Sequence, residues 1–229
     1  MTKDRGVFSI SLIVLFVALC LCLACAGQNA SEMPLLASFD FEDGKAAGWQ
    51  PNLPDNWQVI KHEGSIVYDL IAPGEQGKVR APTSWSLLSG QDVTSFVFMG
   101  RLKCRTEPSN PHRDMCVFFH FQDQTHFYYV HFSASSDESH NIIGLVNGAD
   151  RIKIDLEPAG KSVCRLTETD WHTFKVTCDE ATGRIQAYLD DMETPILTAV
   201  DKTIGHGRVG VGSFDDSGYF DDIKLWGKK

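Results

Sequence analysis

The chain has 229 residues, of which 43% are hydrophobic and 22% charged, and its formal net charge is −9. An acidic chain without basic clusters argues against nucleic acid and against anionic membrane surfaces as partners. Beyond an apolar N-terminal segment, the length suits one all-β domain that buries enough apolar surface to fold by itself.

The N-terminal segment is predicted to be a targeting signal. A basic region at residues 3–5 precedes the apolar run 7–26, as in segments that direct export. Three interpretations remain open: a signal peptide cleaved after residue 25, a lipoprotein signal that leaves Cys25 lipidated, and an uncleaved anchor. Residues 23–25 (Leu-Ala-Cys) resemble a bacterial lipobox, although Cys22 stands where that motif prefers leucine. All three predict an extracytoplasmic domain, lipid-anchored in the cell envelope or secreted, that meets the membrane only through its N-terminus.

Residues 26–34 have the composition of a flexible tether, and residues 35–229 are expected to form the folded domain. Short alternating runs separated by Gly, Pro, Asn and Asp follow one another there, without a long helix-period stretch. The predicted strands are Leu35–Phe41, Trp57–Lys61, Ser65–Leu70, Thr94–Cys104, Met115–Phe121, Phe127–Ser133, Ile142–Val146, Arg151–Leu156, Trp171–Cys178, Arg184–Leu189, Ile196–Val200, Arg208–Phe214 and Tyr219–Trp226. So many short strands predict two stacked antiparallel sheets, a jelly-roll sandwich.

Residues 117–132 are the most informative stretch, because two strand-like runs flank a polar turn. Side chains alternate faces along a strand, and we expect a four-residue loop in which Gln122 pairs with Phe127. This register predicts a core face made of Val117, Phe119, Phe121, Tyr128, Val130 and Phe132. The opposite face would carry Phe118, His120, Tyr129 and His131, with Phe127 at its rim.

An aromatic face with polar tips suits a sugar-binding cleft, since rings stack on pyranose C–H groups and ring nitrogens or phenols bind hydroxyls. The predicted partner is therefore an oligo- or polysaccharide. Trp85, in the loop-like stretch 82–86, is a further candidate for a sugar platform. The predicted ligand-binding residues are Phe118, His120, Tyr129, His131 and Trp85.

Four cysteines lie in the predicted domain: Cys104, Cys116, Cys164 and Cys178. An even number in an exported protein predicts two disulfides, for which three connectivities exist. We favour Cys104–Cys116 and Cys164–Cys178, because each pair sits near the base of two adjacent strand-like runs. Zinc ligation is the rival interpretation, but the domain contains no Cys-x-x-Cys.

Three groups of motifs resemble the concanavalin A-like, laminin-G-like jelly-roll superfamily over essentially the whole exported chain. Residues 39–44 with Trp49 resemble its opening strand, and residues 118–132 resemble its central hairpin. Its closing hairpin resembles residues 207–226. The superfamily includes lectin-like modules, structural domains, β-glucanases, polysaccharide lyases and the 3-keto-disaccharide hydrolase family, so the resemblance implies the fold without deciding the function.

Three functional hypotheses follow. The favoured one is a carbohydrate-binding domain without catalysis. The second is a carbohydrate-active enzyme, either a 3-keto-glycoside hydrolase or a polysaccharide lyase, in which His120, Tyr129 and His131 supply acid and base. The Glu-x-Asp-x-x-Glu motif of laminarinase-like hydrolases is absent, which disfavours hydrolysis by paired carboxylates. The third is a structural surface domain without a small-molecule ligand.

The resemblance also implies a structural Ca²⁺ where the first and last strands meet. Asp40, Asp43 and Asp221 are the hard oxygen donors in the matching segments, and backbone carbonyls would complete the coordination. No cofactor is required by the favoured function, so this ion would serve stability.

Overall fold

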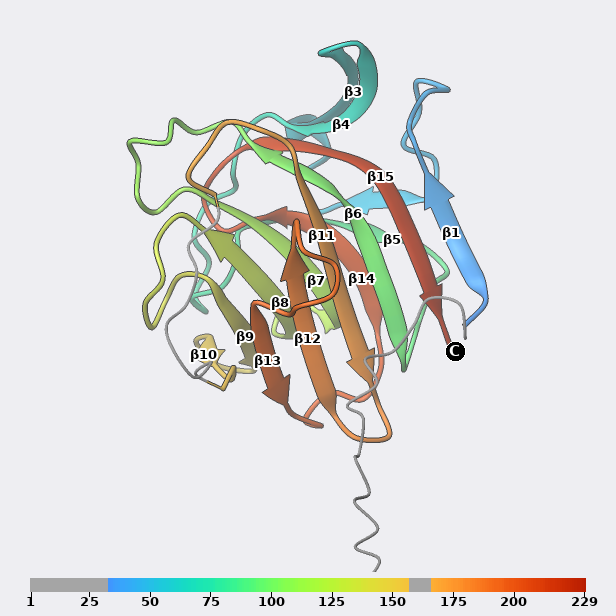
Figure 1. Cartoon of the computed structure of the whole chain (residues 1–229), viewed down its shortest axis with the longest axis vertical. Helices are drawn as coiled ribbons and strands as arrows, with labels where there is room; N and C mark the ends of the chain where they lie inside the picture. Colours follow the sequence, from blue (N-terminus) through green and yellow to red (C-terminus); the bar gives the residue numbers. More distant parts are fainter. Residues whose placement is uncertain (1–32, 157–165) are drawn as a thin grey trace, which may run out of the picture.

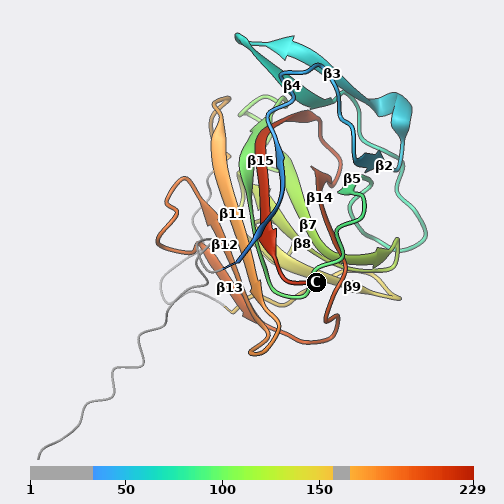
Figure 2. The ribbon, with the colours of Figure 1, turned by 90° about the vertical axis from the view of Figure 1, so that its right-hand side faces the viewer.

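The computed structural model describes residues 33–156 and 166–229. They form two stacked antiparallel sheets (Figures 1 and 2), which confirms the predicted all-β jelly-roll sandwich. Sheet A has the order β13 (Leu197–Val200), β12 (Arg184–Leu189), β11 (His172–Asp179), β6 (Phe96–Cys104), β15 (Gly218–Gly227), β4 (Ser65–Leu70) and β3 (Trp57–His62), and β1 (Leu35–Phe39) also pairs with β15. Sheet B has the order β10 (Ile152–Lys153), β9 (Ile142–Asn147), β8 (His126–Ser133), β7 (Asp114–Asp123), β14 (Arg208–Ser213), β5 (Ser84–Leu88) and β2 (Trp49–Pro51).

Strand β15 pairs with β1, so the first and last strands of the described domain are neighbours in sheet A. One edge of β15 pairs with β6, while the other edge pairs with β4 near its start and with β1 near its end. The pairing with β6 shifts register between Asp221 and Lys224, where Asp222 has a φ of 52°. This irregularity separates the part of β15 that meets β4 from the part that meets β1.

The core lies between the sheets and follows from the alternation of the strands. In β6, residues that face sheet B are buried and alternate with partly exposed ones. Phe96, Phe98 and Phe174 have no exposed surface. Burying one such ring stabilises the fold by about 1.5–3 kcal/mol. The inter-sheet core therefore supplies most of the apolar burial.

Two strands of sheet B were not predicted from the sequence. Strands β2 and β5 fall where no strand was expected, and the predicted strand Arg151–Leu156 shrinks to the two residues of β10. The segment that became β5, Ser-Trp-Ser-Leu-Leu, lacks clear alternation because four of its five residues are buried. Trp85 therefore stands on a strand rather than in a loop.

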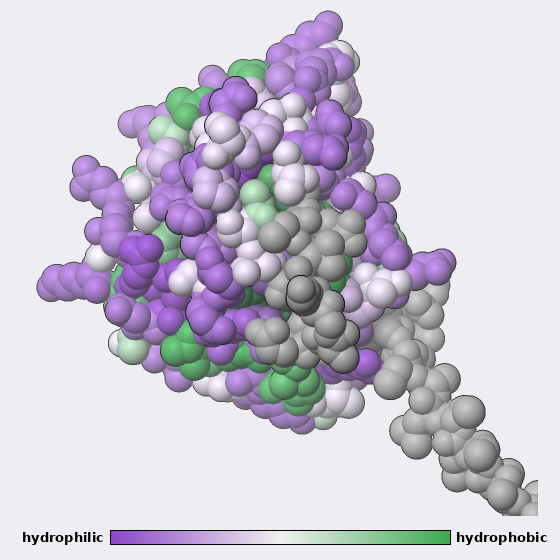
Figure 3. Space-filling view, turned by 60° about the vertical axis from the view of Figure 1, so that its left-hand side comes forward, coloured by the Kyte–Doolittle hydropathy of each residue, from purple (hydrophilic) through white to green (hydrophobic). Residues whose placement is uncertain are grey.

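The face of the molecule shown in Figure 3 is mainly hydrophilic, and its apolar residues form small separate patches. The large apolar side chains left exposed among the described residues are Leu35, Leu53, Ile71, Ile152, Leu156 and Val200. Within the same residues, no helix has the length and apolar character needed to cross a membrane. The predicted leader 1–25, with Cys25, and most of the tether 26–34 lie outside the described residues.

The predicted disulfide Cys104–Cys116 is wrong. Cys104 lies on β6 of sheet A and points into the inter-sheet core, whereas Cys116 lies on β7 of sheet B among the side chains of its outer face. Both are buried free thiols. Strands adjacent in sequence need not be adjacent in a sandwich, and these two belong to different sheets. The other predicted pair cannot be placed, because Cys164 lies outside the described residues.

Candidate functional site

The β7–β8 hairpin has a different register from the predicted one. Its turn is tighter, with Asp123 paired to His126 and two residues between them. The Asp123 carboxylate accepts hydrogen bonds from the Thr125 amide at 2.7 Å and lies 3.0 Å from His126 Nδ1. Phe118 pairs with Tyr129 instead of His131, and a bulge over residues 120–122 absorbs the difference.

The bulge turns His120 into the core. Its φ of 46° is left-handed, an uncommon conformation for a residue other than glycine. The ring packs against Phe96 and Tyr128, and its two nitrogens lie 2.8 Å from the Ile204 oxygen and 2.7 Å from the Thr94 oxygen. Burial lowers the pKa of His120, although the two carbonyls act in the opposite direction. The prediction that His120 shares a face with Tyr129 and His131 is wrong.

The same bulge moves Phe121 from the predicted core face to the outer face of sheet B. The remaining predicted core residues of the hairpin do point into the core. On the outer face, Phe121 joins a second apolar cluster, whose buried members are Ala81, Leu87, Cys116, Phe118, Phe127, Tyr129, Val146 and Phe214. Tyr129 lies flat over its strand neighbour Gly144, where any Cβ would overlap the phenol ring.

A covering segment, residues 71–83 between β4 and β5, closes over this second cluster. Val79 and Ala81 pack on it. The Arg80 amide donates to the Asp150 carboxylate at 2.8 Å, and the Arg151 amide donates to the Arg80 oxygen at 3.0 Å. These bonds fix the segment to the turn after β9. The middle of the outer face is therefore interior rather than a cleft.

In this arrangement, three of the predicted ligand-binding residues are shielded from solvent. Phe118 and Tyr129 have no exposed surface, and His131 is 2% exposed. They share a face as predicted, but the covering segment and its neighbours shield them from solvent. Their role in ligand binding stays a prediction, and in this geometry it would require the covering segment to move.

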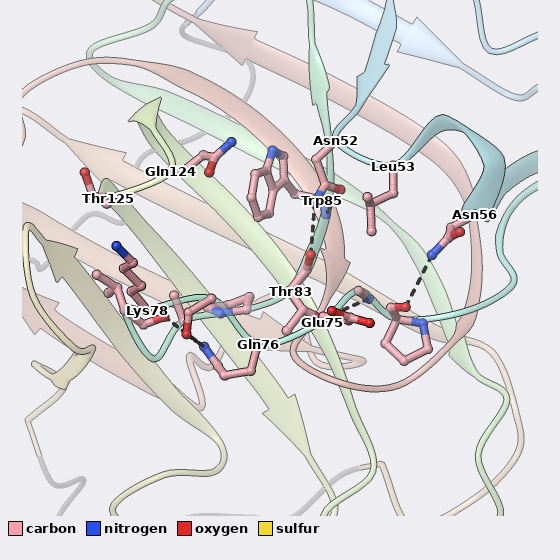
Figure 4. Close-up of a pocket in the computed structure, with 16 residues that line it drawn as sticks. Asn52, Leu53, Asn56, Glu75, Gln76, Lys78, Thr83, Trp85, Gln124 and Thr125 are labelled. Carbon is pink, nitrogen blue, oxygen red and sulfur yellow. Dashed lines mark hydrogen bonds between the residues drawn. The ribbon is translucent and has the colours of Figure 1, made fainter.

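Trp85 is different, because it lines an open cavity of about 860 Å³, the Trp85 cleft (Figure 4). The cleft is bounded by the junction between β2 and the short 3₁₀ helix η2 (Pro54–Asn56), the covering segment and the β7–β8 turn. Asn52 holds β5 in place by accepting from the Trp85 amide at 3.0 Å and donating to the Thr83 oxygen at 3.0 Å. The exposed polar side chains around the indole come from Glu75, Gln76, Lys78 and Gln124.

A second cavity of about 520 Å³ is lined by Phe121, together with Gln122 and Arg208. The ring centroids of Phe121 and of Trp85, which lines the first cavity, are 5.4 Å apart. Arg208 places its guanidinium 5.9 Å from the Phe121 ring and donates to Gln50 at 2.8 Å. The open end of the outer face therefore combines aromatic rings with amide and guanidinium groups, a combination that the sequence pattern indicated only through Trp85.

A structural Ca²⁺ held by Asp40, Asp43 and Asp221 stays a prediction. Asp40 and Asp43 are exposed, and their carboxylates accept hydrogen bonds from the nearby Glu42 and Lys45 amides. Asp221 is buried, and burial raises its pKa. In the described part of the chain, the groups of three side chains close enough to share a cation lie elsewhere.

Comparison with known proteins identifies the fold class. No protein-family model and no curated protein matches the sequence. Among solved structures, the carbohydrate-binding module CBM66 from Bacillus subtilis matches with a TM-score of 0.52 and 17% identity over 78% of this chain and 95% of that one. A mixed-linkage glucan GH16 protein from Bacteroides ovatus matches with a TM-score of 0.54 and 11% identity over 83% and 99%. Lectin I-B4 from Griffonia simplicifolia, in its metal-free form, matches with a TM-score of 0.52 and 11% identity over 82% and 98%.

The chain thus has the concanavalin A-like jelly-roll fold, as the motif resemblance implied. At these identities the likeness concerns the fold alone. The resemblance to the 3-keto-disaccharide hydrolase family stays a prediction.

Proposed function

We propose that this protein is an extracytoplasmic carbohydrate-binding domain that holds an oligo- or polysaccharide in the Trp85 cleft. The observation that carries this proposal is the partly exposed indole of Trp85, backed by Phe121 and rimmed by exposed amide and charged groups. An indole face stacks on pyranose C–H groups, and the rim groups bind hydroxyls. Solved structures with the same fold include a carbohydrate-binding module, a lectin and a glucan-bound GH16 protein, which supports this ligand class.

Replacing Trp85 by alanine is expected to weaken saccharide binding by about 10-fold or more, which corresponds to about 1.4 kcal/mol. A glycan array would first identify ligands of the purified protein, and calorimetry would then compare wild type with Trp85→Ala. The matched control is Trp171→Ala, because Trp171 is also partly exposed but lies immediately before β11, against Arg101.

Equal loss of affinity in both variants, or full affinity in Trp85→Ala, would contradict the assignment. Failure of the wild type to bind any glycan would favour a structural surface domain. The array ligands should also be incubated with the protein and their products analysed. Release of shorter or unsaturated saccharides would show a carbohydrate-active enzyme instead of a binding module.

We also infer that residues 1–25 export the domain and that Cys25 carries a lipid anchor. The basic residues Lys3 and Arg5, the apolar run and Leu-Ala-Cys at 23–25 support this inference. Replacing Cys25 by serine is expected to move the protein from the membrane fraction to the soluble extracytoplasmic fraction and to abolish labelling by a radioactive fatty acid. Unchanged fractionation together with unlabelled wild type would show an uncleaved anchor, and a soluble wild type would show a cleaved signal peptide.

A further inference from the structure

Three side chains with metal-ligand chemistry meet on the outer face of sheet B. Asp114 and Cys116 are two residues apart on β7 and therefore share a face. His131 on β8 pairs directly with Cys116 across the hairpin. The carboxylate, thiol and imidazole ligand atoms all lie within 4.8 Å of one another. Each of the three residues is at most 2% exposed.

One polar atom at this place lacks a hydrogen-bond partner among the described residues. His131 Nε2 is buried and has no hydrogen bond, and Asp114 Oδ2 lies 3.6 Å away, within ion-pair distance. Buried polar atoms are nearly always paired, so this nitrogen beside a carboxylate and a thiol points to a ligand that would complete its pairing.

The neighbours of these side chains orient them as metal ligands are usually oriented. His131 Nδ1 lies 2.9 Å from the Ser139 carbonyl oxygen. The carbonyl can only accept, so Nδ1 carries a proton, and Nε2 is the nitrogen left to face Asp114. Asp114 Oδ1 accepts from the Phe214 amide at 2.7 Å and from the Ser213 hydroxyl at 2.9 Å. A hydrogen bond from the outer nitrogen of a histidine to a carbonyl is the usual support of a metal-bound imidazole.

We propose that Asp114, Cys116 and His131 bind a zinc ion. Zinc takes thiolate, imidazole and carboxylate ligands at about 2.0–2.3 Å, which places tetrahedral ligand atoms roughly 3.5 Å apart. Here Asp114 Oδ2 lies 3.6 Å from His131 Nε2, and the Cys116 thiol donates a hydrogen bond to Asp114 Oδ1 at 3.7 Å. A thiol and an imidazole suit zinc and disfavour calcium, which takes oxygen ligands.

The cluster adjoins a cavity at His131. A cavity of about 230 Å³ is lined by His131 and also by Asp215, Arg80 and Arg151. This zinc site is independent of saccharide binding at Trp85.

The test uses purified protein freed of metal by a chelator. Calorimetry is expected to show one zinc ion per chain, and zinc is expected to raise the melting temperature. Cys116→Ala should weaken zinc binding by about 100-fold or more, since it removes a direct ligand. The matched control is Cys104→Ala, because Cys104 is an equally buried thiol that points into the core away from the cluster.

Cobalt gives a readout on the unaltered protein, which keeps the test valid if a variant fails to fold. A cobalt complex should show thiolate-to-metal charge-transfer absorption that disappears on adding zinc. The proposal is overturned if the folded wild type binds no zinc, if the cobalt spectrum lacks the thiolate band, or if Cys116→Ala binds zinc as well as the wild type. Binding of calcium without zinc would also overturn it and would point to Asp114, Asp215 and Asp216 as an all-oxygen site.

Discussion

Replacing Phe118 by alanine is expected to lower the free energy of unfolding by about 3–5 kcal/mol. The ring has no exposed surface and contacts Phe121, Phe127 and Tyr129, with centroids 5.7 to 6.4 Å apart. Its removal would leave a cavity beneath the covering segment. Urea denaturation of wild type and variant would measure the loss, with Phe118→Leu as the control that keeps most of the volume.

The same variant separates a packing role from a binding role. Under conditions in which Phe118→Ala stays folded, its saccharide affinity is expected to equal that of the wild type, because the covering segment keeps the ring from the ligand. Trp85→Ala should show the opposite pattern, with weaker binding and a smaller change in stability. A large loss of affinity in folded Phe118→Ala would mean that the covering segment opens to admit the ligand.

Replacing Gly212 by valine is expected to lower the free energy of unfolding by about 3 kcal/mol, at the upper end of the usual cost of overpacking. Gly212 on β14 pairs with Trp85 on β5. A Cβ at this position would overlap the Ser84 carbonyl oxygen and lie 2.9 Å from the Trp85 Cα. Both obstacles are backbone, so β5 would have to move away from β14.

The control for this variant is Gly205→Val, because a Cβ at Gly205 would meet no atom within 4 Å. Urea denaturation should place the Gly205→Val midpoint close to that of the wild type and the Gly212→Val midpoint well below it. Equal midpoints for the two variants would show that β5 and β14 are not so closely packed. A shifted β5 would also carry Trp85 out of position, so Gly212→Val is expected to weaken saccharide binding.

Much of the fold followed from the sequence, because alternation and turn residues are local signals. The inward orientation of Val117, Phe119 and Tyr128 was predicted correctly even though the hairpin register was not. A register shift of two residues keeps every side chain on its face. The bulge could not be foreseen, because it depends on a left-handed His120 held by carbonyls of two distant segments.

The candidate site was harder to predict, since it depends on contacts between distant parts of the chain. An aromatic face such as Phe118 and Tyr129 looks the same in sequence whether it meets ligand or another segment. Here Val79 and Ala81 of the covering segment pack on this face, so it meets another segment of the chain. The disulfide prediction failed for a related reason, because sequence proximity does not reveal which sheet receives β6 and which receives β7.

The pairing of β1 with β15 has a consequence for how the molecule is made. Leu35 lies opposite Trp226, so the first and last strands of the domain hydrogen-bond to each other. Such contacts between sequence-distant residues slow folding. Among the described strands β1 pairs with β15 alone, so β1 has no neighbour in sheet A until β15 has been synthesised.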